Sequence, residues 1–233
     1  MPDASTLPAS SSPAPRIAVV TGAKGGLGSA IVRELESTGR FAKVFAPGRS
    51  DLDVTAADSV ARFFGELDRI DLLVNNAGLT RDVPIARMAE DQWDKVIDGN
   101  LRGAFLCSRA ALKLMIRQRS GLIVNIGSFS ALRPPPGQAA YAAAKAGLIG
   151  LTQSLAEEAG KRNVRVNCVL PGFLEGTGMT RDLPADVIEL ARQSHVLGRF
   201  NTPVEAARFV AFLDTLEAVS GQVFQLDSRL RRW

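Results

Sequence analysis

Short runs of apolar residues alternate with longer segments of helical period from about residue 16 onward. The apolar runs cover 17–21, 42–46, 70–74, 122–126, 164–169 and 223–226. Runs of this length without polar alternation are typical of strands buried on both faces. Segments with apolar residues at helical spacing lie between most of them, at about 26–39, 91–117, 139–161 and 203–213. The pattern therefore predicts strands that alternate with helices.

Alternating strands and helices build βαβ units, which place parallel strands in one sheet between two layers of helices. We therefore expect an α/β fold, a Rossmann-type doubly wound parallel sheet flanked by helices. The 233 residues suit a single domain, which we place at 16–233. The first 15 residues are rich in Pro, Ser and Ala, so we expect a disordered N-terminal tail rather than a signal peptide.

One connection is shorter than this fold requires. The apolar run 42–46 is followed almost at once by Leu52-Asp53-Val54-Thr55. A crossover helix between parallel strands needs about a dozen residues or more. Either that helix is missing here, or the run at 52–55 is only a stub of a strand.

Composition narrows the chemistry. With one His and two Cys, Cys107 and Cys168, we expect neither a metal site nor a disulfide framework. The net charge of +4 is mild, and its basic residues are mostly interleaved with acids, which does not favour nucleic-acid binding. No window of 18 apolar residues predicts a membrane span, so we expect a cytoplasmic protein. A single Tyr stands among eleven Phe.

Residues 21–28, Thr-Gly-Ala-Lys-Gly-Gly-Leu-Gly, form a glycine-rich turn between a predicted strand and a predicted helix. Glycines there allow a tight turn and bring the backbone and the helix N-terminus close to a pyrophosphate. The turn is not a Walker loop, because Ser29 rather than Lys follows Gly28. Its position between strand and helix predicts dinucleotide binding.

Tyr141 and Lys145 lie four residues apart on a predicted helix, so their side chains share one face. An ammonium beside a phenol favours the phenolate, so we expect Lys145 to lower the pKa of Tyr141. Such a Tyr suits proton donation to a ketone oxygen or the reverse step. Ser128 follows the strand run 122–126 and can stabilise negative charge on that oxygen. Considered alone, Tyr141 and Lys145 would be an ordinary amphipathic pair on a helix. Ser128 alone would be a strand-end or helix-cap residue.

Taken together, these motifs resemble the short-chain dehydrogenase/reductase family. The matches are Thr-Gly-x-x-x-Gly-x-Gly at 21–28, Asn75-Asn76-Ala77-Gly78, Asn100, Ser128, Tyr141 with Lys145, and Pro171-Gly172, in the family's order over about residues 16–227. The resemblance implies that Asn100, Ser128, Tyr141 and Lys145 are the catalytic residues. It also implies that Asn100 holds a water linking Lys145 to solvent and that Lys145 binds the nicotinamide ribose. His195 matches no nucleophilic triad, so we expect it to be structural or substrate-facing.

The second strand run is followed by Gly48 and Arg49, where NAD sites typically have an acid. Lys24 and Arg49 could converge on a 2′-phosphate, so we predict NADP, although Asp51 nearby leaves NAD open. The resemblance implies that Asp53 and Val54 contact the adenine. The predicted cofactor-binding residues are Thr21, Gly22, Lys24, Gly26, Leu27, Gly28, Arg49, Asp53, Val54, Asn76, Ala77, Gly78, Tyr141, Lys145, Pro171 and Gly172.

Within the family, five stretches of this sequence are most similar to the sequences of 3-oxoacyl-[acyl-carrier-protein] reductases: 77–82, 137–141, 145–150, 171–174 and 197–200. That likeness implies NADPH-dependent reduction of a 3-oxoacyl thioester, on carrier protein or CoA, to the (3R)-3-hydroxyacyl form in fatty-acid-type synthesis. Arg119 and Arg162 match the family's positions for docking the acidic carrier protein. We also expect a homo-oligomer, a tetramer or a dimer.

Two other functions stay open: a reductase of small ketones or quinones, and a non-catalytic dinucleotide-binding subunit. The sequence also departs from the family pattern in places. The segment after Arg49 is short, the loop 171–180 carries an extra residue, and Leu226-Asp227-Ser228 replaces the family's Asp-Gly-Gly. A basic tail follows these residues. Together these departures leave the shape of the substrate pocket and the oligomeric state open.

Overall fold

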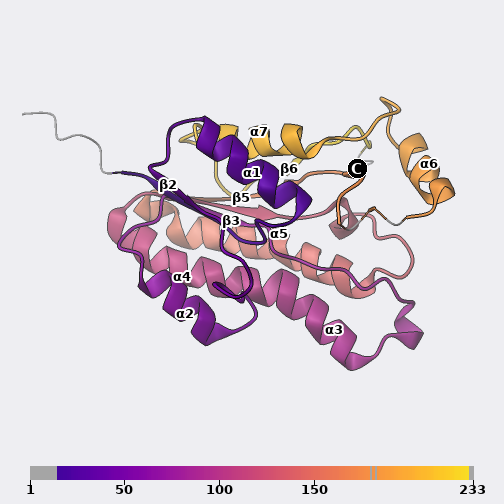
Figure 1. Cartoon of the computed structure of the whole chain (residues 1–233), viewed down its shortest axis with the longest axis horizontal. Coiled ribbons are helices and arrows are strands. Elements are labelled where there is room, and N and C mark those ends of the chain that lie inside the picture. The colour runs from indigo at the N-terminus through magenta and orange to yellow at the C-terminus, as the bar shows by residue number, and fades with distance from the viewer. Residues whose placement is uncertain (1–14, 179, 182, 231–233) are drawn as a thin grey trace, which may run out of the picture.

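A computed structural model describes residues 15–178, 180–181 and 183–230 of the chain (Figure 1). Within them, six strands form one fully parallel sheet in the order β2-β1-β3-β4-β5-β6. The predicted single α/β domain with a parallel sheet is confirmed. The predicted N-terminal tail, 1–15, lies outside the described residues except for its last position. The strands are β1 (Ile17–Val20), β2 (Lys43–Phe45), β3 (Leu72–Asn75), β4 (Gly121–Ile126), β5 (Val164–Leu170) and β6 (Val223–Gln225).

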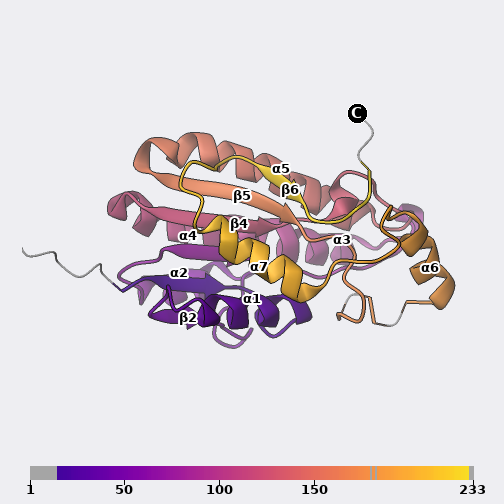
Figure 2. The ribbon, with the colours of Figure 1, turned by 90° about the horizontal axis from the view of Figure 1, so that it is seen from above.

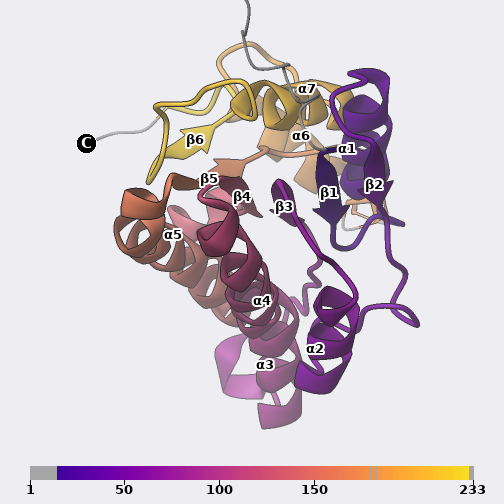
Figure 3. The ribbon, with the colours of Figure 1, turned by 90° about the vertical axis from the view of Figure 1, so that its left-hand side faces the viewer.

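Helices cover both faces of the sheet (Figure 3). On one face, α1 (Gly26–Ser37) packs against α7 (Pro203–Leu213) over a core that includes Ile31, Leu35 and Val210. On the other face, α2 (Ala57–Gly65), α4 (Gly103–Gln118) and α5 (Ala139–Ala159) close a second core. α3 (Glu90–Ile97) precedes α4, and α6 (Ala185–Gln193) projects beyond the end of the sheet (Figure 2). Burial on both faces explains why the strands are mostly apolar.

The short connection after β2 changes the edge of the sheet. No helix lies between Phe45 and Leu52 in the described chain, and residues 52–55 form no strand. The crossover helix is therefore missing, as the sequence allowed, and β2 remains an edge strand of three residues. The chain returns directly to α2 on the opposite face and then to β3, beside β1. The sheet thus changes winding direction between β1 and β3, the place where such folds bind their ligands.

The predicted helix at 91–117 is interrupted by one wide π turn, Asp98–Arg102, between α3 and α4. The two helices α2 and α6 were not predicted. Within the described residues, no helix is both long and apolar enough to cross a membrane.

Candidate active site

The glycine-rich turn is tied to the end of β3. The Thr21 hydroxyl accepts hydrogen bonds from the backbone N–H groups of Asn76 and Ala77, both at 3.0 Å. The side-chain amide of Asn76 donates hydrogen bonds to the backbone carbonyls of Thr21 and Gly22. Gly22 has φ +63°, and a Cβ placed there would lie 2.7 Å from Ala77 Cα. A Cβ on Gly28 would meet Gly22 O at 2.4 Å, so the turn depends on both glycines.

This turn fits a dinucleotide pyrophosphate. Gly25 caps α1 without a side-chain hydrogen bond, and the first turn of the helix contains no acidic residue. The N–H groups and the positive end of the helix are therefore available to an anion. Gly26 faces the Thr177 side chain, at 3.2 Å from the position a Cβ would take. Leu27 is buried in the core beneath the turn.

The expected 2′-phosphate residues gather beside the turn. A Cβ on Gly48 would lie 2.8 Å from Lys24 Nζ and 3.3 Å from Asp51 Oδ2, so both side chains lie over Gly48. Arg49 is 80% exposed and pairs with Asp53 at 3.2 Å. The hydroxyl of Thr55 holds the pKa of Asp53 below its usual value, with Arg49 adding to the effect. Val54 instead packs against Gly103 at the start of α4.

Ser128 stands at the carboxyl end of β4, in extended conformation. Its hydroxyl accepts a hydrogen bond from the Ser130 N–H at 3.1 Å and also bonds Tyr141. Ser130 donates to Gln138, which in turn donates to Asp82. This chain of bonds links the Ser128 turn to the start of α5, and sequence reasoning missed it because its members lie far apart in the chain.

Tyr141 and Lys145 lie on one face of α5, as their spacing predicted, and both are buried. The direction expected for the Tyr141 pKa is wrong for this structure. The pKa of Tyr141 is raised to about 12, chiefly by burial; the hydrogen bond with Ser128 opposes this rise and the charge of Asp82 adds to it. Lys145 Nζ lies 5.5 Å from the centre of the Tyr141 ring and donates to the Ile126 carbonyl at 2.8 Å. Spacing alone could not show how completely this pair is removed from water.

Burial lowers the pKa of Lys145 to about 8. The side chain is 3% exposed and, in the described part of the chain, forms no ion pair with a carboxylate. Without such a pair, the charged form of Lys145 is unfavourable. Its ammonium loses its hydration on burial and gains only one hydrogen bond, to the Ile126 carbonyl.

Asn100 lies in the π turn between α3 and α4, a feature often found at functional sites. It is 1% exposed and donates to the carbonyls of Leu79 and Val96, whereas its Oδ1 has no hydrogen-bond partner among the described residues. A Cβ on Gly78 would lie 2.4 Å from that Oδ1 and 3.5 Å from Lys145 Nζ. The glycine thus keeps open the space between Asn100 and Lys145.

Asn75 and Asn125 form a buried polar network below this site that sequence reasoning did not single out. The two are paired in register on β3 and β4, and Asn75 donates to Asn125 at 2.8 Å and to Ser108. Asn125 in turn donates to Thr152 on α5. The network fixes α4 and α5 to β3 and β4, the strands that lead into the predicted site.

The predicted residues meet at the carboxyl edge of the sheet, with two exceptions. Thr21, Asn76, Ser128 and the Pro171-Gly172 turn follow β1, β3, β4 and β5. Arg119 instead ends α4, and Arg162 precedes β5, so both lie at the amino ends of the strands. The predicted docking residues are therefore at the opposite edge of the sheet from Ser128. His195 is buried rather than open to substrate.

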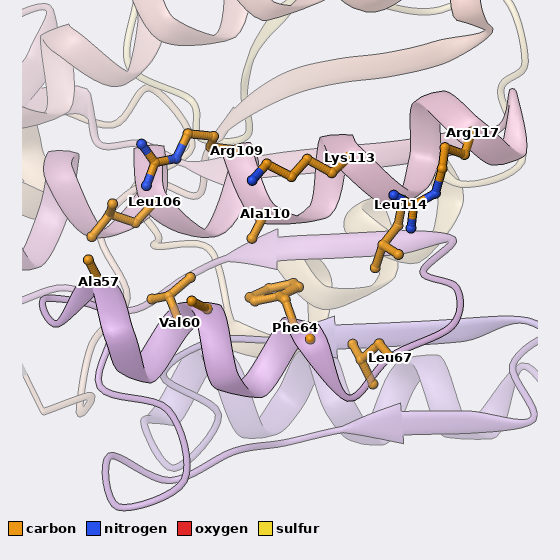
Figure 4. Close-up of a pocket in the computed structure, with 12 residues that line it drawn as sticks. Ala57, Val60, Phe64, Leu67, Leu106, Arg109, Ala110, Lys113, Leu114 and Arg117 are labelled. Carbon is orange, nitrogen blue, oxygen red and sulfur yellow. The ribbon is translucent and has the colours of Figure 1, made fainter.

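A groove between α2 and α4 is separate from this site (Figure 4). Its floor is apolar, with Val60 and Phe64 on α2, and Arg109, Lys113 and Arg117 lie along α4. Its lining includes none of the predicted site residues.

Replacing Lys145 by Met should stabilise the folded chain while removing the ammonium from the site. At pH 7 we expect the free energy of unfolding to rise by about 2 kcal/mol, because Met needs no hydration. The folded pKa of Lys145, about 8, is lower than the unfolded value of 10.5. Between these two pKa values the unfolded chain binds more protons than the folded chain, so the free energy of unfolding of the parent protein rises with pH. The parent should therefore regain the stability that it lacks relative to Lys145→Met as pH rises from 8 to 10.5.

Urea unfolding at pH 7 and pH 10 measures this difference, with the exposed Lys113→Met as the control. A Lys145→Met protein less stable than its parent at pH 7 would contradict the burial argument. The same difference in unfolding free energy between variant and parent at both pH values would also contradict it.

Comparison with known proteins identifies the family. A family model described as short chain dehydrogenase matches residues 49–187. The 3-oxoacyl-[acyl-carrier-protein] reductase of Thermotoga maritima is 45% identical over 193 aligned positions, which cover 79% of this chain and 78% of the relative. That of a Synechocystis species is 41% identical, covering 91% and 95%. Nodulation protein G of a Rhizobium species is 38% identical, covering 92% and 96%. The chain therefore belongs to the short-chain dehydrogenase family, as its motifs indicated.

Proposed function

We propose that this chain is an NADPH-dependent ketoreductase. It reduces a 3-oxoacyl thioester, linked to carrier protein or CoA, to the (3R)-3-hydroxyacyl form in fatty-acid-type synthesis. The observation that carries the proposal is the convergence of Ser128, Tyr141 and Lys145 at one strand end, with the Tyr141 pKa raised by burial. Relatives named as 3-oxoacyl-[acyl-carrier-protein] reductases support the substrate class.

The residues divide the chemistry among them. Bound NADPH supplies the hydride. The Ser128 hydroxyl, already bonded to Tyr141, hydrogen-bonds the ketone oxygen and stabilises the charge that develops on it. Tyr141 donates its proton to that oxygen, which suits a phenol that stays protonated at neutral pH. Lys145, with a pKa of about 8, holds a proton that can replace the one given up by Tyr141.

Asn100 extends the path for that proton. Its Oδ1 is buried without a partner among the described residues, and Gly78 leaves space between it and Lys145 Nζ. A water bonded to Asn100 would there connect the ammonium to solvent, as the family resemblance implies. The positioning of Asn100 depends on the π turn that precedes α4.

The cofactor residues are assigned as predicted from the sequence, with NADP as the cofactor. The Lys24 side chain lies over Gly48, and Arg49 is the residue after Gly48. Two cations therefore lie just beyond the end of β2. A 2′-phosphate there accepts charge-assisted hydrogen bonds from both. Asp51 accepts a hydrogen bond from the Gly48 N–H, which directs one carboxylate oxygen to the backbone.

Carrier docking at Arg119 and Arg162 has a geometric consequence. Both residues lie at the amino ends of the strands, away from Ser128. A carrier docked on them lies at the opposite edge of the sheet from Ser128 of the same chain. We therefore propose that it delivers its thioester to another subunit of the expected homo-oligomer, which we propose to be a cytoplasmic homotetramer.

Reduction assays on 3-oxoacyl thioesters, small diketones and quinones test the activity. With NADPH, acetoacetyl carrier protein or acetoacetyl-CoA should be reduced at least tenfold faster than the small ketones. Tyr141→Phe should lower kcat about a thousandfold, because positioned proton transfer contributes a factor of about 10²–10⁴. Activity on small ketones alone would favour the alternative reductase, and unchanged activity in Tyr141→Phe would contradict the mechanism.

The cofactor assignment makes a separate prediction. Arg49→Asp should raise the KM for NADPH about tenfold or more, because a charge-assisted hydrogen bond contributes roughly 1.5–3 kcal/mol, and should leave the KM for NADH within twofold or lower. The exposed Arg62→Asp on α2 is the control. An unchanged NADPH KM would exclude Arg49 from a phosphate site.

A further inference from the structure

The segment Asp227–Arg229, which we name the C-terminal strap, follows β6 at the catalytic edge of the sheet. It overlaps the residues that replace the family's Asp-Gly-Gly, Leu226-Asp227-Ser228, and Arg229 begins the basic tail that follows them. The contacts of the strap reach three loops that surround Ser128, and neither the proposed mechanism nor the cofactor assignment uses them.

Asp227 is the anchor of the strap. Its side chain is 0% exposed, so its carboxylate needs hydrogen bonds from within the protein. Oδ1 accepts from Gln225 Nε2 at 2.7 Å and from the Arg229 backbone N–H at 3.2 Å. Oδ2 accepts from Arg229 Nε at 2.7 Å and from its Nη2. The carboxylate thus fixes both the backbone and the side chain of Arg229.

Arg229 lies over the loop that carries the catalytic serine. Its guanidinium carbon lies 3.7 Å from the centre of the Phe129 ring, and Phe129 directly follows Ser128. The side chain is only 16% exposed, so the stacking takes place largely away from water. A planar guanidinium can stack flat on a ring while its edge makes two hydrogen bonds to a carboxylate, whereas an ammonium is a point charge without that flat face.

The strap also packs on the turn after β5. Gly172 has φ +87°, and a Cβ there would lie 2.7 Å from Asp227 Cβ. The backbone of the predicted cofactor turn Pro171-Gly172 therefore rests directly on the anchor residue. A side chain at 172 would push the two segments apart.

On its third side, the strap holds the chain that follows α6. The Val196 N–H donates to Ser228 O at 3.2 Å, and the Leu197 N–H donates to the Ser228 hydroxyl at 3.3 Å. His195 Nε2 lies 3.8 Å from Asp227 Oδ2, and the His195 ring packs edge-on against Phe200. The strap thus joins this segment to the Ser128 loop.

We propose that Arg229, held by Asp227, is a positioning residue for the reduction. It fixes Phe129 and with it the Ser128 hydroxyl against Tyr141, while Ser228 holds the segment after α6 in place. The effect on turnover rests on the proposed function, whereas the mechanical link between strap and loop does not. The positioning acts on the chemical step rather than on cofactor binding, because Arg229 stacks on Phe129, beside Ser128, whereas the cofactor turn Pro171-Gly172 packs on Asp227, which the Arg229 variants keep.

Steady-state kinetics of Arg229→Met and Arg229→Lys test the proposal. Met keeps the length and apolar packing over Phe129 but loses the bonds to Asp227. We expect kcat on acetoacetyl-CoA to fall about tenfold, a barrier change of about 1.4 kcal/mol, with the KM for NADPH within twofold. Arg229→Lys should recover part of the loss, and the exposed Arg33→Met on α1 should change neither constant.

Hydrogen–deuterium exchange of the same proteins provides a readout that needs no substrate. In Arg229→Met, the amides of Ala131 and Leu132 in the Ser128 turn, and those of Val196 and Leu197, should exchange faster, while those of β4 keep their protection. If the parent reduces no 3-oxoacyl thioester, the proposed function fails, and exchange alone decides on the strap.

Unchanged kcat and unchanged exchange in Arg229→Met would each overturn the positioning role. A parallel fall of kcat, NADPH affinity and the unfolding midpoint would also overturn it, because that result would mark a general loss of stability.

Discussion

The predicted active site is organised around one hydrogen bond from a buried ammonium. Lys145 Nζ donates to the Ile126 carbonyl, at the last residue of β4, and so joins α5 to the strand that leads into Ser128. The same burial that permits this bond lowers the pKa of Lys145 and raises that of Tyr141. An unpaired buried charge destabilises the fold, so this geometry is kept at the expense of stability, as is common at functional sites.

The loops around this bond are held by contacts between distant parts of the chain. Asn76 ties the glycine turn to β3, and the Asn75–Asn125 pair ties the strands to α4 and α5. At the other side, the C-terminal strap connects the loops after β4 and β5 with the segment after α6. A parallel sheet makes this possible, because it brings the carboxyl ends of all strands to one edge.

The sequence was sufficient to predict the strands and the shared helix face of Tyr141 and Lys145, for physical reasons. Strands buried on both faces appear as apolar runs, and helical spacing places Tyr141 and Lys145 on one face. The π turn at Asn100 was missed because one extra residue hardly disturbs a helical period. α6 was missed although Val187, Leu190 and Ala191 share one helix face, because the helix has only nine residues and no strand run follows it closely. The strap and the direction of the Tyr141 pKa depend on tertiary contacts and burial, which spacing does not encode.

Burial, rather than Lys145, sets the protonation of Tyr141 in the free protein. Because Tyr141 is the single Tyr of the chain, the phenolate absorbance near 295 nm reports on it without background. Titrating the cofactor-free protein with alkali, while circular dichroism follows folding, measures that pKa directly. We expect no phenolate in the folded protein below about pH 11, in keeping with a pKa of about 12. A folded protein whose phenol titrates at pH 10 or below would contradict the account.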